Sequence, residues 1–364
     1  MATIWTACKD RGSHNNVEPV ALELVRRGHN VIRIASGRAA ESYARAGTPH
    51  LSHFSAHEIV KALSLPDLLF TGMSVGDDAG RDLIPLILNT VPIVAQQDWW
   101  GGVLKTDWSA REFRPDCIFV NDQAGKEIVL ANWLDMCDEE VRALGYPFYD
   151  EFARTDVEKV CAETRVKLGI PENARVVFFA GSCARPEAHA VISEGEILSE
   201  VLTALEDPRI EKEEFVLIVR PHPGLGNLVP DEKDGWDAAL KQYRGKLVDS
   251  SGCTTNEVTA TADVVVSMTS SVLVEAALMR KQVVSVLYPI MKERFIMEVG
   301  GAMTEFPLAE LGCCVTATNR SEITAKIDLA LACKLDLRSA QEEHLRADGG
   351  NTARVTDFLE SLIL

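Results

Sequence analysis

The sequence of 364 residues contains no basic run and no long apolar run. Its 37 lysines and arginines are outnumbered by 54 aspartates and glutamates, which gives a formal net charge of −17. A surface of that charge repels nucleic acid and anionic membranes. Because no apolar run approaches the roughly 18 residues of a membrane span, we expect neither nucleic acid binding nor stable membrane insertion.

Cysteine pairs at the spacing of a metal or redox site are also missing. The nine cysteines are scattered along the chain without a CxxC spacing, the spacing that zinc sites and dithiol redox centres use. We interpret them as reduced and mostly buried thiols. The first residues, MATIWTACKDRGSHNN, lack the basic and then apolar stretch of a signal peptide, so we expect a cytoplasmic protein.

The sequence has no DxD motif, no short-period repeat and no low-complexity segment. Two aspartates at that spacing are the usual means of bringing a divalent cation to a sugar nucleotide, since such cations prefer oxygen ligands. We therefore expect no metal site and no cofactor.

What the sequence does contain is a regular alternation of short apolar runs and amphipathic stretches. Strands separated by helix-length patterns predict βαβ units and a parallel sheet. Strands are expected at residues 3–8, 30–35, 67–72, 92–97 and 116–121, and then at 175–181, 214–220, 246–249, 262–267, 282–288 and 313–317. In the second series, helices are expected at 186–206, 234–243, 269–280 and 321–334.

The two series of strands predict an α/β protein with two Rossmann-like, doubly wound parallel-sheet domains facing each other across a cleft. The chain length favours two domains, and the stretch LGYPFYDEFART at 144–155 separates the series. We expect domains at 1–150 and 151–345, and a C-terminal helix at 346–364 that packs back toward the first domain. Ligands bind beyond the carboxyl ends of such strands, and the cleft is the expected site.

The first loop, after the strand at 3–8, carries three candidate residues. Gly12 and Ser13 are expected to form a tight turn, and the amides at the start of the following helix suit a diphosphate or a substrate oxygen. His14 is a candidate general base, because a neutral imidazole near pH 7 accepts a proton from a hydroxyl. An equal alternative is that His14 only hydrogen-bonds the loop or caps the helix.

The stretch VAQQDWWGGVLKTDW at 94–108 places Asp98, Trp99 and Trp100 at a strand end. A carboxylate there can accept a proton, and an aromatic face can hold a sugar ring. The alternative interpretation is that the tryptophans pack between the domains while Asp98 caps a helix. A functional role is slightly favoured, because tryptophan is a large apolar residue to find in a loop.

In the second domain the strand FVLIVR at 215–220 runs directly into PHPG. Pro221 and Pro223 are expected to hold the chain extended and to restrict His222. Arg220 adds a cation that binds phosphate oxygens through two N–H groups. We predict a diphosphate contact here; in the alternative, the prolines only end the strand and Arg220 pairs with a surface carboxylate.

The segment ADVVVSMTSSVLVEAALMRKQVV at 262–284 reads strand, loop, helix, strand. Ser270 or Thr269 is expected to cap the helix, and Ser270 and Ser271 place hydroxyls and amides where the helix dipole favours an anion. Glu275, about one turn later, either accepts hydrogen bonds from ribose hydroxyls or is a plain helix charge.

Over nearly its whole length the chain resembles the GT-B fold glycosyltransferases, a class with two Rossmann-like domains. This class includes the non-hydrolysing UDP-N-acetylglucosamine 2-epimerases and the CDP-glycerol glycerophosphotransferases. The resemblance lies in GSHNNVEPVALELVRRGHNV (first loop and helix), ALGYPFYDEF (entry to the second domain), RPHPG (the KxHP element) and residues 262–284 (the helix that grips diphosphate and ribose).

QDWWGGVLK at 97–105 is similar to the glycerophosphotransferase pattern QLWHGTPLK. Trp100 stands at the position of that pattern's proposed base, a histidine. Met268 stands at the acidic position of the family's DYSS element. The opening signature of the epimerases is absent from the first loop.

The resemblance implies a metal-independent glycosyltransferase with an acceptor domain, a nucleotide-sugar domain and a role in cell-surface polysaccharide or glycoconjugate synthesis. Two alternatives stay open: a nucleotide-sugar 2-epimerase or CDP-glycerol glycerophosphotransferase-like enzyme, and a catalytically inactive nucleotide-sugar-binding protein. The acceptor is unassigned and a homodimer stays open. The expected site residues are His14 and Asp98 for catalysis, Gly12, Ser13, Trp99 and Trp100 for the acceptor, and Arg220, His222, Ser270, Ser271, Glu275, Gly181 and Ser182 for the nucleotide diphosphate.

Overall fold

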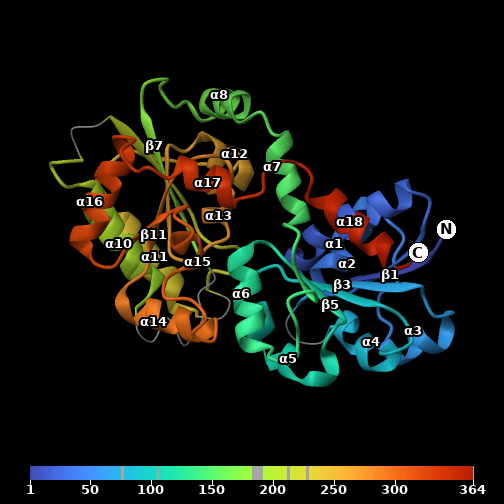
Figure 1. Cartoon of the computed structure of the whole chain (residues 1–364). Coiled ribbons are helices and arrows are strands. Elements are labelled where there is room, and N and C mark those ends of the chain that lie inside the picture. Colours follow the sequence, from blue (N-terminus) through green and yellow to red (C-terminus); the bar gives the residue numbers. More distant parts are fainter. Residues whose placement is uncertain (75–77, 105, 183–191, 211–213, 227–228, 364) are drawn as a thin grey trace. The chain divides into compact units, whose positions relative to one another are not determined.

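The computed structural model describes the whole chain except residues 75–77, 105, 183–191, 211–213, 227–228 and 364. The chain divides into two compact units. Unit 1 comprises Met1–Arg154, Met297–Met303 and Arg346–Leu364, and unit 2 comprises Thr155–Ile296 and Thr304–Leu345. The last helix of the chain therefore belongs to the same unit as the first strand (Figure 1).

Unit 1 is built on a six-stranded parallel sheet in the order β2-β1-β3-β4-β5-β6. Its strands are β1 (Thr3–Cys8), β2 (Asn30–Ala35), β3 (Leu68–Gly72), β4 (Ile93–Gln96), β5 (Cys117–Val120) and β6 (Val141–Ala143). Its helices are α1 (Arg11–Arg26), α2 (Gly37–Ala46), α3 (Ala56–Ala62), α4 (Ala79–Ile87), α5 (Thr106–Ser109), α6 (Gln123–Asn132), α7 (Asp150–Arg154) and α18 (Asn351–Ser361), with short 3-10 helices η1 (Gly102–Leu104), η2 (Arg111–Phe113) and η3 (Pro147–Tyr149).

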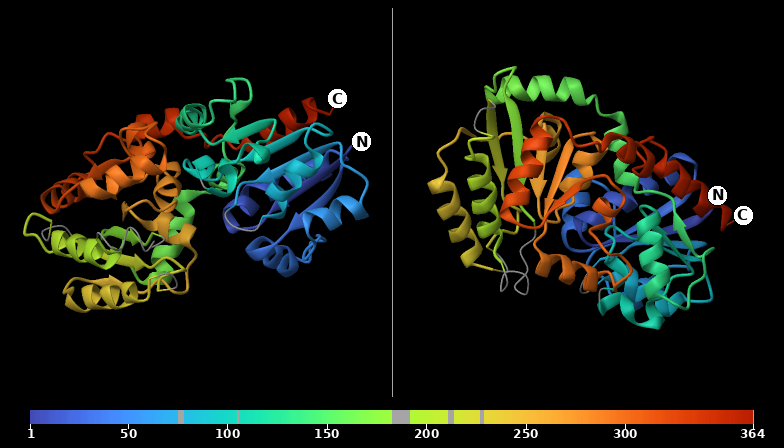
Figure 2. Two further views of the ribbon diagram at one scale, coloured as in Figure 1. Left: turned by 90° about the horizontal axis from the view of Figure 1, so that it is seen from below. Right: turned by 60° about the vertical axis from the view of Figure 1, so that its left-hand side comes forward.

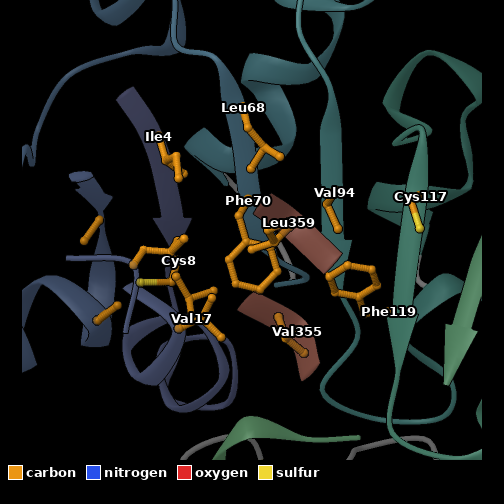
Figure 3. Packing of buried hydrophobic residues seen from close by; sticks show 14 of the residues in the cluster. Ile4, Cys8, Val17, Leu68, Phe70, Val94, Cys117, Phe119, Val355 and Leu359 are labelled. Carbon is orange, nitrogen blue, oxygen red and sulfur yellow. The ribbon is translucent and has the colours of Figure 1, made fainter. Parts of the chain in front are cut away.

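The core of unit 1 joins the two ends of the chain. Side chains from α1, α2 and five strands of the sheet form one buried apolar cluster, and Val355 and Leu359 of α18 complete it (Figure 3). The ring of Phe358 meets that of Phe119 edge-on at 5.3 Å. Figure 2 shows α18, at the red end of the colour bar, beside the first part of the chain. Burying this apolar face is what holds the last helix on unit 1.

Unit 2 repeats the architecture, with a six-stranded parallel sheet in the order β12-β11-β10-β7-β8-β9. Its strands are β7 (Arg175–Ala180), β8 (Phe215–Arg220), β9 (Leu247–Val248), β10 (Val264–Ser267), β11 (Gln282–Val286) and β12 (Val315–Ala317). Its helices are α8 (Val157–Leu168), α10 (Glu194–Leu205), α11 (Asp231–Gln242), α12 (Thr255–Thr261), α13 (Val272–Leu278), α14 (Pro289–Glu298, whose last two residues belong to unit 1), α15 (Pro307–Glu310), α16 (Arg320–Leu331) and α17 (Arg338–His344).

The predicted fold class is confirmed: two Rossmann-like parallel sheets are each flanked by helices. Every predicted strand is present, with ends within two residues of those expected. The prediction missed β6, whose three residues VRA contain no apolar run. The predicted helix at 186–206 corresponds to α10, and residues 186–191 of that prediction lie outside the described part of the chain. Among the described residues, no helix combines the length and the apolar character needed to cross a membrane.

Candidate functional site

Each sheet has one place where the strand order reverses. In unit 2 the chain passes from β7 to β8 and β9 on one side, and then returns to β10 on the other side of β7. In unit 1 the corresponding reversal lies between β1 and β3. The carboxyl ends of strands at such a switch point border the ligand crevice of doubly wound sheets. The loops after these strands are therefore the places to compare with the predicted site residues.

Gly181, directly after β7, touches the main chain that follows β8. A Cβ added to Gly181 would lie 2.6 Å from the amide nitrogen of His222 and 3.1 Å from the Cα of Pro221. The Gly181 amide donates to the carbonyl oxygen of Arg220 at 2.8 Å. Since real side chains almost never approach backbone so closely, glycine is required for these two strand ends to meet.

The histidine of the RPHPG stretch has a defined tautomer. The amide of Gly224 donates to Nδ1 of His222 at 3.0 Å, so in the neutral imidazole the proton lies on Nε2. Nε2–H is then a donor suited to a phosphate oxygen. Arg220 is half-buried, and its Nη1 donates to the carbonyl oxygen of Cys253 at 2.9 Å.

One expectation for this stretch is wrong: the chain does not stay extended past His222. The amide of Leu225 donates to the carbonyl oxygen of His222 at 2.8 Å, which closes a turn. Pro223 occupies the second position of that turn, where its restricted φ is suited to turning the chain. The prolines therefore place His222 at a corner.

The helix that follows β10 is shorter than predicted. It runs over Val272–Leu278 instead of 269–280, and its N-cap is Ser271, not Ser270 or Thr269. Ser271 takes this place because its carbonyl accepts from the amide of Glu275 at 3.1 Å. Ser271 is exposed, whereas Ser270 and Glu275 are half-buried.

The end of α13 is also set by backbone geometry. Arg280 adopts a left-handed φ of 60°. The amide of Lys281 donates to the carbonyl oxygen of Ala276 at 3.0 Å, as in a Schellman motif. The helix therefore stops before Arg280.

Ser182 uses its polar groups inside the protein. Its amide donates to Oε1 of Glu194 in a short hydrogen bond. Its hydroxyl lies 3.2 Å from Oγ of Ser267 and accepts from the amide of Thr269 at 3.2 Å. Ser182 links β7 to the loop after β10 and is only 7% exposed. Its polar groups are engaged inside the protein, which does not fit the predicted direct contact with the diphosphate.

Glu194 is a buried acid that the sequence interpretation missed. It is the first residue of α10 and is 3% exposed. Burial raises its pKa to about 8, and the charge of Glu232 acts in the same direction. The positive end of α10 opposes this by about 0.3–1 kcal/mol, less than one pKa unit. Burial therefore favours the neutral acid over the carboxylate.

In unit 1, Gly12 and Ser13 do not form the predicted turn. Both lie in the first turn of α1, whose N-cap is Asp10. Ser13 and Asp10 form a capping box, in which each side chain bonds the other residue's amide. Ser13 is fully buried and also accepts from Oγ of Ser74 at 2.9 Å. The Ser13 hydroxyl therefore holds the start of the helix, which does not fit the predicted acceptor contact.

Gly12 faces Asp98 and the loop after β6. A Cβ on Gly12 would lie 2.2 Å from Oδ2 of Asp98. The Tyr146 hydroxyl donates to the carbonyl oxygen of Gly12 at 3.3 Å. The structure therefore brings Gly12 and Asp98 together, a contact that the sequence did not predict.

His14 lies about one turn after the start of α1, and its side chain is half-buried. Its ring packs on that of Tyr43, with centroids 4.8 Å apart. Burial lowers the pKa of His14 below its usual 6.5. Because the ring stays neutral at pH 7, it remains able to accept a proton.

The two tryptophans of the WWGG stretch have different environments. Trp100 is 3% exposed, and its indole N–H donates to both carboxylate oxygens of Asp122 at 3.0 Å. Asp122 also caps α6. Trp99 is half-buried and meets the Trp100 ring edge-on at 4.8 Å. Trp100 therefore has a packing role in unit 1, and Trp99 is the better candidate for contact with an acceptor.

Comparison with known proteins places this arrangement in a family. Residues 106–294, more than half of the chain, match the family of CDP-glycerol:poly(glycerophosphate) glycerophosphotransferases. The chain belongs to this family. No curated protein matches the sequence.

Solved structures similar to this glycerophosphotransferase-family protein share its whole architecture. The UDP-GlcNAc 2-epimerase of Neisseria meningitidis, bound to UDP-GlcNAc, has a TM-score of 0.66 at 12% identity over 99% of this chain and 100% of the other. HepE of Anabaena, in complex with UDP and glucose, has 0.62 at 14% over 100% of both chains. A variant of the wall teichoic acid polymerase TagF has 0.59 at 14% over 99% and 88%. These similarities establish the GT-B fold.

Proposed function

We propose that this protein transfers a sugar from a nucleotide-diphosphate donor to an acceptor hydroxyl, with unit 2 binding the donor and unit 1 the acceptor. The observation that carries the proposal is the contact between Gly181 and the His222 amide. It brings the carboxyl ends of β7 and β8 together beside the switch point of unit 2. The glycine lets the two strand ends meet, and it thereby places Arg220 and His222 at the edge of the sheet where doubly wound folds bind their ligands.

On the donor side, charge is the main contribution of the protein. Arg220 supplies a guanidinium cation and His222 an Nε2–H donor, and the backbone amides near Ser270 and Ser271 add further donors. These groups stabilise the negative charge that develops on the diphosphate as it leaves. Glu275 would accept hydrogen bonds from the ribose. Because protein groups supply the donors, and the sequence has no DxD motif, the proposed transfer is metal-independent.

On the acceptor side, Asp98 or His14 takes the proton. The acceptor oxygen forms a bond to the anomeric carbon while the bond from that carbon to the diphosphate oxygen breaks, and the diphosphate keeps the electron pair. Asp98 is supported by its contact with Gly12 at a strand end, and His14 by its neutral ring. Trp99 provides an aromatic face for a sugar acceptor. An acceptor in a cell-surface polysaccharide or glycoconjugate fits this chemistry.

Transfer of glycerol phosphate from CDP-glycerol is the second candidate, because the family match covers residues 106–294. The same donor groups would hold the CDP part. What separates the two reactions is Trp100, which stands at the place of the histidine in the glycerophosphotransferase pattern and is buried against Asp122. A buried indole cannot act as a base, which favours sugar transfer.

The test is a panel of UDP-sugars, CDP-sugars and CDP-glycerol, measured by thermal shift and then by product analysis with and without acceptor. We expect one nucleotide sugar to raise the unfolding temperature. Its Kd should be at least tenfold higher in Arg220→Ala and in His222→Ala than in the native protein. Arg209→Ala is the matched control, since Arg209 pairs with Asp207 on the surface of unit 2. Turnover of CDP-glycerol but of no nucleotide sugar would support the second candidate. The absence of a shift with every nucleotide would exclude both transfer reactions.

A further inference from the structure

The donor side of unit 2 contains a chain of hydrogen bonds that begins at a buried acid. Glu194 accepts the Ser182 amide, and the Ser182 hydroxyl accepts the Thr269 amide at 3.2 Å. Thr269 directly precedes Ser270 and Ser271. The conformation of the loop after β10 thus depends, through two hydrogen bonds, on a side chain at the start of α10.

The surroundings of Glu194 favour its neutral form. Oε2 of Glu194 is buried, and the effect of burial on the pKa outweighs the opposite effects of the Ser182 amide and the Trp236 side chain. On α11, Glu232 is 1% exposed and accepts the amide of Gly195 at 2.7 Å. A Cβ on Gly195 would lie 2.7 Å from the carbonyl carbon of Gly235, so α10 and α11 are packed too tightly for the two acids to separate.

The other elements near Glu194 bring no compensating positive charge among the described residues. From the loop after β7 it accepts the Ser182 amide, and from α11 the side chain of Trp236 acts on it. On α16, Arg320 pairs with Glu200 at 3.4 Å. The charge that acts on Glu194 is that of Glu232, which is of the same sign.

We propose that Glu194, as a buried neutral acid, is the positioning residue of the donor site: it holds Ser182, and through it the Thr269–Ser271 loop, so that ionisation of Glu194 weakens donor binding. The proposal rests on the proposed function, since the loop matters only if it binds a nucleotide diphosphate. An ionised Glu194 would repel both Glu232 and the diphosphate. Donor affinity therefore falls as the pH rises above neutrality.

The test compares Glu194→Gln with the native protein. Glutamine keeps an oxygen for the Ser182 amide but cannot ionise. Glu196→Gln is the matched control, because Glu196 lies on the same helix and is exposed. Its side chain accepts the amide of Ser193 in a capping box, and a glutamine side chain can accept the same amide. Binding of CDP is measured by calorimetry at pH 7 and pH 9, both above the second ionisation of its phosphate at about pH 6, so that the charge of CDP changes little.

The Kd of the native protein and of Glu196→Gln is expected to rise about tenfold between pH 7 and pH 9, the effect of one pKa unit. In Glu194→Gln the Kd should stay constant. A Glu194→Gln variant that loses CDP affinity at pH 7, or that shows the native pH dependence, would overturn the proposal.

Unfolding measured from pH 4.5 to 9 gives a second readout that needs no ligand. The pKa of Glu194 is raised in the folded state, so its contribution to stability is complete at low pH and is lost as the pH rises to about 8. Glu194→Gln should therefore gain stability relative to the native protein across that window, and parallel profiles would contradict the neutral acid. If the profiles diverge but no variant binds CDP or UDP, the proposed function fails while the ionisation of Glu194 stands.

Discussion

Gly12 and Asp98 are in contact across unit 1, although they belong to stretches far apart in the sequence. Oδ2 of Asp98 occupies the space that a Cβ on Gly12 would need, at 2.2 Å. Helix α1 therefore presents its backbone to this carboxylate at the carboxyl end of the sheet. The contact makes the position of Asp98 sensitive to the smallest possible change at residue 12.

Gly12→Ala should reduce turnover without unfolding the protein. Alanine in a helix is about 1 kcal/mol more favourable than glycine, which offsets the displacement of a short side chain. We expect a free energy of unfolding within about 1 kcal/mol of the native value and a clear loss of kcat. Gly252→Ala is the control, since no atom lies within 4 Å of the added Cβ. Unchanged kcat in Gly12→Ala would argue against Asp98 as the base.

Gly181→Ala should be destabilising as well as impaired in donor binding. The added Cβ meets the main chain of Pro221 and His222, and backbone cannot move aside as a side chain can. Overpacking of this kind costs about 1–3 kcal/mol. Denaturant unfolding and nucleotide titration both report on this change. A variant with native stability would show that β7 and β8 separate easily at their ends.

Trp100→Phe should mainly lower stability, and Trp99→Phe should mainly impair acceptor binding. Loss of the Trp100 N–H removes a buried hydrogen bond to Asp122 and is expected to cost about 1–3 kcal/mol. Trp99→Phe is expected to change stability by less than about 1 kcal/mol, because that ring is half-buried, and to raise the KM for the acceptor. Thermal unfolding and acceptor kinetics measure the two effects. Equal effects on stability would contradict the different roles assigned to these rings.

The pKa of His14 should be below 6.5 in an NMR titration, because burial disfavours the charged ring. The unfolded chain then binds the proton more readily than the folded one. The stability contributed by neutral His14 is present above pH 6.5 and is lost as the pH falls below it. His14→Gln should therefore be less acid-sensitive than the native protein between pH 5 and 7, measured by denaturant unfolding. A native-like loss of stability in His14→Gln would rule out His14 as its source.

Much of the fold was predictable because its strands are short apolar runs bounded by polar residues. β6 was missed since its three residues carry no such pattern. Ligands of parallel sheets bind beyond the carboxyl ends of the strands, and this rule also predicted the edge of each sheet at which Asp98, Arg220 and His222 lie. The same rule applied to the strand at 116–121 would have identified Asp122, which follows β5 directly. Nothing in the sequence marked Glu194, which reaches Ser182 only through the packing of α10 against α11.

The order of apolar and polar residues determined the two parallel sheets and the loops that carry polar side chains, because this information is local. Which of those side chains remain for a ligand was decided by tertiary structure alone. Ser13, Ser182 and Trp100 look like ligand contacts in the sequence, yet in the fold each has polar partners inside the protein. The close approach of Gly181 to His222 likewise exists only after β7 and β8 have paired. Hydrogen bonds and close packing between distant segments depend on where the folded chain brings them, and a local pattern does not contain that information.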